Sequence, residues 1–107
     1  MAIYEKRTYD IAVGKMNEVA AFYRDTGWPA LESGGYADNL LGYFISETGP
    51  LHQLIHIWRF EDDTTRRAFW NRLFADEAFM AEVAVLRQNI LRQEVQLMAS
   101  APWGPTP

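Results

Sequence analysis

The stretch that decides the fold is residues 40–60, LLGYFISETGPLHQLIHIWRF. Its two halves, 40–47 and 51–60, are rich in β-branched, aromatic and other apolar residues, which is typical of strands. Between them lies the short turn-forming segment Thr-Gly-Pro at 48–50. Strands joined by so short a turn pair antiparallel, so this stretch predicts a β-hairpin.

The segments before the hairpin predict one strand and one helix. Residues 3–11, IYEKRTYDI, are rich in β-branched and aromatic residues and alternate in part, as a half-buried strand does. Apolar residues then recur at the i, i+3, i+4, i+7 spacing of an amphipathic helix over 15–27: Met16, Val19, Ala20 and Tyr23. Gly27 and Pro29 predict the end of that helix, and 28–39 is expected to be a connection.

The segments after the hairpin predict a helix in two parts and a last strand. Asp62 or Asp63 can cap the first part, and Asp76 can restart the helix. The expected inner residues are Phe69, Trp70, Leu73 and Phe74, followed by Phe79, Met80, Val83 and Leu86. Residues 91–98 place apolar side chains on one face against polar ones on the other and predict the last strand.

The predicted elements follow the order β-α-β-β-α-β, so the fold class is α+β. This is the ferredoxin-like arrangement, a four-stranded antiparallel sheet with helices on one face. We expect one domain at residues 1–100 and a proline-rich tail at 101–107. The uncovered face should be polar if it meets water, but the strands offer Tyr, Trp and Phe. Burial against the sheet of a second copy, in a homodimer, resolves this conflict.

Composition and charge exclude several classes of protein. The chain has 107 residues and no cysteine, which excludes a disulfide framework, a thiolate metal site and a cysteine nucleophile. The net charge of −4 argues against nucleic-acid binding, and a solvated helix face explains the basic pair Arg66-Arg67 better. We see no secretory signal and no apolar run of the roughly 18 residues that a membrane span needs, so a cytoplasmic location is expected.

Several motifs carry a resemblance to a known family. In order they are YEKRTY at 4–9 with Gly14, GYFISETG at 42–49, HIWRF at 56–60 with Arg66 or Arg67 beyond, and ADEAF at 75–79. Their order and spacing resemble the NIPSNAP family, within the dimeric α/β-barrel superfamily. The resemblance implies a barrel-like homodimer with a cavity between sheet and helices. The chain departs from the family pattern at Lys6, usually apolar, at His52, usually Asn, and at Phe79, usually Trp.

Five residues are candidates for a ligand site. Glu5, Arg7 and Tyr9 alternate along a strand and therefore share one face, about 6.6 Å between successive side chains. They can contact a polar ligand, or form a structural ion pair that fixes the register of a dimer, which is the preferred interpretation. His56 would share a strand face with Trp58. A partly buried histidine can act as an acid or base, although a packed core residue is the more common case.

The two histidines are not expected to bind a metal together. Four residues of a strand span about 13 Å, which places His52 and His56 too far apart for one ion. Alternation alone does not settle which face of this strand meets the helices, because Ile55 and Ile57 compete for that role.

The leading functional hypothesis is a homodimer, without metal or cofactor, that binds a small aromatic or amphiphilic molecule in its cavity. Aromatic residues make up 14% of so small a chain, which favours a pocket or a subunit interface over a core alone. The second hypothesis is a cofactor-independent oxygenase or isomerase that uses His56, by analogy of fold. The third is a protein-interaction module. An enclosed cavity with convergent polar groups favours the first two, and an exposed apolar patch favours the third.

Overall fold

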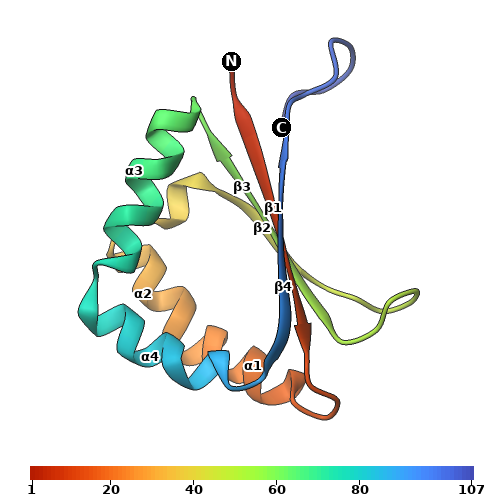
Figure 1. Ribbon diagram of the computed structural model, residues 1–107, viewed down its shortest axis with the longest axis vertical. Helices are drawn as coiled ribbons and strands as arrows, with labels where there is room; N and C mark the ends of the chain where they lie inside the picture. Colours follow the sequence, from red (N-terminus) through yellow and green to blue (C-terminus); the bar gives the residue numbers. More distant parts are fainter.

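Four strands and four α-helices make up the computed structural model, which describes residues 1–107 (Figure 1). The strands are β1 (Ile3–Ile11), β2 (Leu40–Ile45), β3 (Gln53–Phe60) and β4 (Ile90–Met98). The α-helices are α1 (Met16–Phe22), α2 (Trp28–Ser33), α3 (Asp63–Phe74) and α4 (Glu77–Arg87). A π-helical turn, Tyr23–Gly27, joins α1 to α2, and a 3-10 turn, Ala37–Asn39, precedes β2.

The strands form one antiparallel sheet in the order β2-β3-β1-β4. The central strand β1 places Arg7 opposite His56 of β3 on one side and opposite Val95 of β4 on the other. All the helices lie on one face of this sheet (Figure 1). The predicted ferredoxin-like α+β fold is therefore confirmed.

Alternate residues of β3 face the helices. Leu54, His56, Trp58 and Phe60 are each at most 4% exposed, so they point into the layer between sheet and helices. Ile55 and Ile57 alternate with them and lie on the open face. The larger core cluster joins this strand to the middle of α3: Leu31, Tyr36, Trp58, Phe60, Phe69, Trp70 and Leu73.

The prediction that Gly27 and Pro29 end the first helix is wrong, because helical structure continues to Ser33. Pro29 lies in the first turn of α2, where a missing N–H removes no hydrogen bond within the helix. The chain leaves the helix at Gly35, whose φ of +77° suits glycine. There the Tyr36 N–H donates to the Leu31 carbonyl at 2.9 Å, as in a Schellman cap.

The open face of the sheet is less aromatic than expected. Trp58 and Phe60 face the helices, and the open face carries Tyr4 and Phe44 among polar side chains such as Lys6. The phenol of Tyr4 donates to the carbonyl oxygen of Pro107 at 2.6 Å, so the end of the tail lies against the Tyr4 side chain. No helix of the chain is long and apolar enough to cross a membrane.

The β2–β3 turn contains a strained residue. His52 has a φ of +60° and is the one residue other than glycine with a positive φ, so β3 begins at Gln53 rather than at residue 51. The left-handed conformation is costly for most side chains but is tolerated by Asn. We expect His52→Asn to raise the free energy of unfolding by at most about 1 kcal/mol in urea denaturation, because His adopts this conformation more readily than most residues. His52→Ala is the control, and equal stability of the two variants would argue against backbone strain.

Candidate functional site

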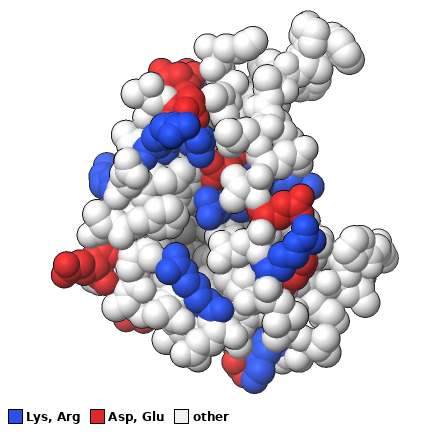
Figure 2. Space-filling model, in the orientation of Figure 1, with Lys and Arg blue, Asp and Glu red and all other residues white.

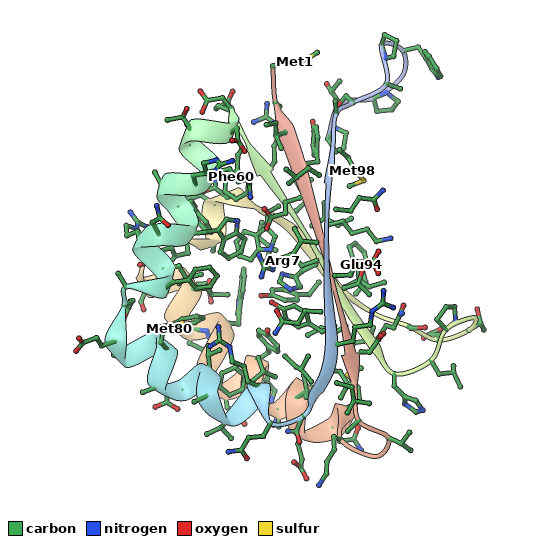
Figure 3. The ribbon with its side chains drawn as sticks, in the orientation of Figure 1. Met1, Arg7, Phe60, Met80, Glu94 and Met98 are labelled. Carbon is green, nitrogen blue, oxygen red and sulfur yellow. The ribbon has the colours of Figure 1, made fainter.

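A cavity lies between the sheet and the pair α3 and α4. Its volume is about 60 Å³, and 13 of the 17 residues that line it are hydrophobic. All four strands and both of these helices contribute to its wall. Figure 2 shows a hollow at the centre of the face seen, with basic side chains beside it. Figure 3 shows Arg7 pointing from the sheet into the space between the sheet and the helices.

Four of the five candidate residues line this cavity: Arg7, Tyr9, His56 and Trp58. They lie on the neighbouring strands β1 and β3, where cross-strand pairing brings Arg7 next to His56. The fifth, Glu5, lies beside Arg7 with no exposed surface and is not part of the cavity wall.

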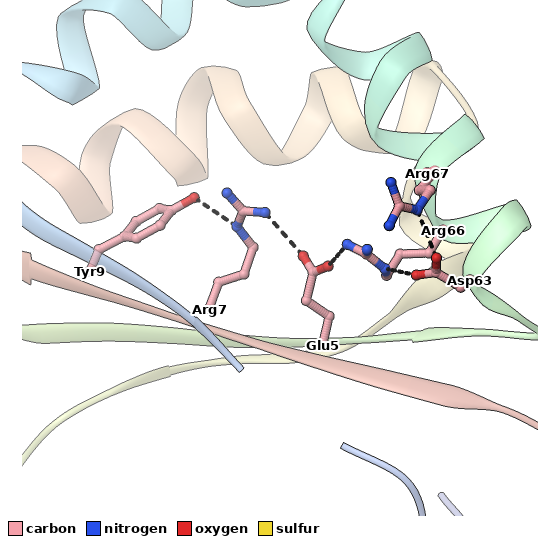
Figure 4. A network of polar contacts seen from close by, with 6 residues as sticks. All are labelled: Glu5, Arg7, Tyr9, Asp63, Arg66 and Arg67. Atoms are coloured by element: carbon pink, nitrogen blue, oxygen red, sulfur yellow. Dashed lines mark hydrogen bonds and ion pairs between the residues drawn. The ribbon is translucent and has the colours of Figure 1, made fainter. Parts of the chain in front are cut away.

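Glu5 is the centre of an ion network within one chain (Figure 4). Its carboxylate accepts a hydrogen bond from Arg7 Nη1 at 3.0 Å and another from Arg66 Nη1 at 2.8 Å. Asp63, at the start of α3, accepts from Arg66 Nε at 2.9 Å and Arg67 Nε at 2.7 Å. Three guanidinium groups face two carboxylates, which leaves one net positive charge. The network ties β1 to α3.

The expectation that Arg66 and Arg67 lie together on a solvated helix face is wrong. The side chain of Arg66 is only 16% exposed, whereas that of Arg67 is 72% exposed. The Glu5–Arg7 pair also lies on the helix side of the sheet, away from the open face on which a dimer register would be fixed. Its visible role is to hold the helical layer on the sheet.

Arg7 presents a charged donor to the cavity. Its Nε donates to the Tyr9 hydroxyl oxygen at 3.3 Å, and its Nη1 donates to Glu5. Its guanidinium carbon lies 4.5 Å from the centre of the Trp70 ring, a cation–π contact. No group of the chain accepts a hydrogen bond from the remaining nitrogen, Nη2. Arg7 is therefore held on three sides and retains one free donor group.

His56 is held as a neutral ring. Its Nδ1 accepts a hydrogen bond from Trp58 Nε1 at 2.7 Å, and its ring stacks on Tyr43 with 4.8 Å between centroids. An indole nitrogen only donates, so Nδ1 carries no proton and the neutral ring carries its proton on Nε2. Burial, with a smaller effect of the Arg7 charge, lowers the pKa of His56 to about 3. At neutral pH this side chain is a hydrogen-bond donor through Nε2.

Two buried ring nitrogens of residues that line the cavity have no hydrogen-bond partner. They are His56 Nε2 and Trp70 Nε1, both buried. A buried donor left without an acceptor costs about 1–3 kcal/mol, and folded proteins rarely retain one without a reason. Burial also raises the pKa values of Tyr23 and Tyr43, which keeps both phenols neutral. The cavity thus combines apolar walls with unpaired N–H groups.

Trp70 and Tyr43 are site residues that sequence reasoning missed. The helical pattern correctly places Trp70 on the inner side of α3. Its contact with Arg7 depends on how α3 lies across β1, and no spacing in the sequence carries that information. Tyr43 follows Gly42, where the β2–β3 register shifts, so simple alternation along β2 does not give its side.

The low pKa of His56 makes stability depend on pH. An unfolded histidine takes up a proton near pH 6.5, whereas folded His56 stays neutral down to about pH 3. Between these values the unfolded state binds more protons than the folded state. The contribution of neutral His56 to the free energy of unfolding is therefore fully present above about pH 6.5 and is lost as the pH is lowered toward 3. We expect a loss of about 1.4 kcal/mol per pH unit from this group. Urea denaturation at several pH values measures it, and His56→Phe should show a shallower acid dependence than the wild type.

The structure contains no group of three or more His, Asp or Glu side chains that could hold a metal ion. His52 lies in the β2–β3 turn, and His56 faces the cavity, so the two do not share a site.

These features define a ferredoxin-like α+β protein, and comparison with known proteins agrees with this fold. The NIPSNAP family model matches residues 4–105, and the chain belongs to this family. A NIPSNAP family protein of unknown function from Agrobacterium tumefaciens str. C58 is 31% identical, with 97% of this chain and 92% of that chain covered and a TM-score of 0.89.

Two further solved structures extend the comparison. An uncharacterized NIPSNAP-like domain protein from Burkholderia xenovorans is 24% identical, with 98% and 90% of the two chains covered and a TM-score of 0.90. An antibiotic biosynthesis monooxygenase is 20% identical, with 94% and 99% covered and a TM-score of 0.64, which shows a shared fold alone. No curated protein matches the chain.

Proposed function

We propose that this NIPSNAP family protein binds a small aromatic or amphiphilic molecule in the cavity between its sheet and its helices. The observation that carries the proposal is an apolar cavity in which unpaired polar groups of Arg7, His56 and Trp70 occur together. Ligand sites in proteins combine mostly apolar walls with a few polar groups that fix orientation. A packed core of the same size would not leave several donors without partners.

The size of the cavity limits the enclosed part of the ligand. One water needs about 10–15 Å³ of cavity volume, so the 60 Å³ cavity has room for roughly four to six waters. An apolar cavity of about 150 Å³ holds a benzene ring, so this space encloses only part of a ring and the rest of the ligand extends beyond it. The rings of Tyr43 and Trp70 in the wall provide faces and edges against which an aromatic ring packs favourably.

We also propose that the protein is a homodimer whose two subunits pack together through the open faces of their sheets. On this side Leu41 is 44% exposed and Phe44 54% exposed. They line an apolar groove together with Ile57, Met98 and residues of the tail. A second sheet packed face to face would remove this surface from water. If the protein is monomeric, the same groove favours the third hypothesis, a surface for another protein.

A second candidate function is a cofactor-independent oxygenase or isomerase, and the protonation of His56 favours a particular form of it. With a pKa of about 3, His56 is a poor general base at neutral pH. Its Nε2–H is instead suited to donate a hydrogen bond to an oxygen on which negative charge develops, such as that of an enolate. In this candidate function His56 stabilises an oxyanion and another group removes the proton.

Native mass spectrometry of the protein purified from its own host tests the proposal. We expect a dimer that carries a small molecule in stoichiometric amount. Val83 lines the cavity, whereas Val85 on the same helix is 60% exposed, so Val83→Trp and Val85→Trp form a matched pair. The bound molecule should be lost from the folded Val83→Trp protein and retained by Val85→Trp. Wild-type protein without a bound molecule, or one retained in Val83→Trp, would contradict the proposal.

A further inference from the structure

We infer that the ligand is an anion, a small carboxylic acid with an aromatic or branched apolar body whose carboxylate is held by Arg7, His56 and Trp70. The inference rests on the proposed function and narrows it to one chemical class. It follows from the hydrogen-bonding capacity of the cavity wall, from the charges around it and from its size.

Three unpaired groups of the cavity can only donate, unlike the phenols of Tyr23 and Tyr43 and the amide of Gln93, which also line it and can donate or accept. Arg7 Nη2 is a charged donor with no acceptor in the chain. His56 Nε2 and Trp70 Nε1 are buried ring N–H groups without partners, since Trp58 fixes the proton of His56 on Nε2. An ionised carboxylate offers only acceptors, with about four lone-pair sites on its two oxygens. One carboxylate therefore matches the three donors, whereas an amine or an ammonium group matches none of them.

The charges around the cavity also favour an anion. The cavity wall contains two arginines, Arg7 and Arg87, and no Asp or Glu, although the chain carries a net charge of −4. The nearest carboxylate on β1, Glu5, already accepts hydrogen bonds from Arg7 and Arg66. The network has one more guanidinium than carboxylates, but its outermost member, Arg67, is 72% exposed, so the cations that act on the cavity are Arg7 and Arg87 in its wall. Both attract a single negative charge.

The remaining walls define the rest of the ligand. A phosphate monoester would bring nearly two negative charges into a site with mostly hydrophobic walls. A neutral alcohol or amide would satisfy some N–H groups but would not be attracted by the two arginines. A carboxylate on a single ring or a branched chain satisfies the donors, carries a single negative charge and places its apolar body against the hydrophobic walls.

Titration calorimetry with two matched compounds tests this inference. Benzoate and benzyl alcohol share a ring and differ in charge, and we expect wild-type protein to bind benzoate more tightly. Trp70→Phe keeps an aromatic side chain and removes one unpaired N–H, so the variant should fold. We expect it to weaken benzoate binding about 10- to 100-fold, the loss of one hydrogen bond to a charged group. Binding of benzyl alcohol should change less than twofold, and Trp103→Phe, in the exposed tail, should change neither.

The alternative outcomes separate the inference from the proposed function. Benzyl alcohol binding as tightly as benzoate in the wild type would overturn the choice of an anion and leave the cavity as a site for neutral molecules. Benzoate binding that is unchanged by Trp70→Phe would overturn the assignment of the carboxylate to these donors. If neither compound binds and the native protein carries no small molecule, both the inference and the proposed function fail.

Discussion

Replacement of Glu5 by alanine is expected to lower the free energy of unfolding by up to about 3–5 kcal/mol, because it leaves two largely but not fully buried arginines without their shared carboxylate. Glu5 has no exposed surface, and the side chains of Arg7 and Arg66 are only 12% and 16% exposed. Removing one partner of a buried pair leaves an uncompensated charge, which costs far more than the pair contributes to stability. Urea denaturation, followed by the fluorescence of the buried tryptophans, measures the loss.

Two comparison variants identify the cause of this effect. Glu5→Gln keeps the shape and one acceptor oxygen, so it should lose less stability than Glu5→Ala. Glu61→Ala removes the partner of Arg59 from a pair in which the Glu61 side chain is 73% exposed, and it should change stability little. A Glu5→Ala protein as stable as Glu61→Ala would show that the network is not what holds β1 to α3.

Replacement of Trp58 by alanine is the second change with a large expected effect, a loss of about 3–5 kcal/mol of unfolding free energy. Trp58 is 1% exposed and packs against Phe69 and Trp70, so its removal leaves a cavity in the larger core cluster. The variant also leaves Nδ1 of His56 without its donor. Thermal or urea unfolding measures the loss, and Trp103→Ala, at 76% exposed, is the control that should have little effect.

Trp58→Phe separates the packing role from the hydrogen bond. Phenylalanine keeps most of the buried ring surface but cannot donate to His56, so the stability loss should be smaller than for alanine. The proton of His56 is then no longer confined to Nε2, a change that ¹⁵N NMR of the imidazole ring detects. An unchanged tautomer in folded Trp58→Phe would show that Trp58 does not position the proton of His56.

Much of the fold could be predicted from the sequence because its signals are local. The turn between β2 and β3 and the two acidic N-caps depend on residues a few positions apart. In the structure Asp62 accepts from the Thr65 N–H at 2.7 Å and Asp76 accepts from the Phe79 N–H at 3.1 Å, as the sequence pattern indicates. The order of elements then leaves the ferredoxin-like sheet as the simplest arrangement.

The predictions that were wrong concern residues that are compatible with more than one backbone conformation. Proline ends a helix from its interior but is compatible with a first turn, and Pro29 is the second case because a π-helical turn separates α1 from α2. His52 belongs to a stretch with strand-like composition, yet the turn requires a positive φ at that position. Neither outcome could be read from composition or periodicity.

The site could be predicted only in part, because burial and tertiary partners decide its chemistry. Alternation on β1 correctly groups Glu5 with Arg7, but the second partner of Glu5 is Arg66, 61 positions away. His56 has the residue type of an acid or base, and only its burial and its bond from Trp58 make it a neutral donor. The third donor, that of Trp70, comes from a helix whose placement over β1 the sequence does not specify.

The most direct measurement is ¹H–¹⁵N NMR of the indole N–H groups while benzoate is added to the wild-type protein. The Nε1–H of Trp70 is buried without a partner, so its resonance should move downfield as it donates a hydrogen bond to the carboxylate. The resonance of Trp103, in the exposed tail, should stay in place. A Trp70 resonance that does not move at saturating benzoate, or a shift confined to Trp103, would contradict an anion-binding cavity between the sheet and the helices.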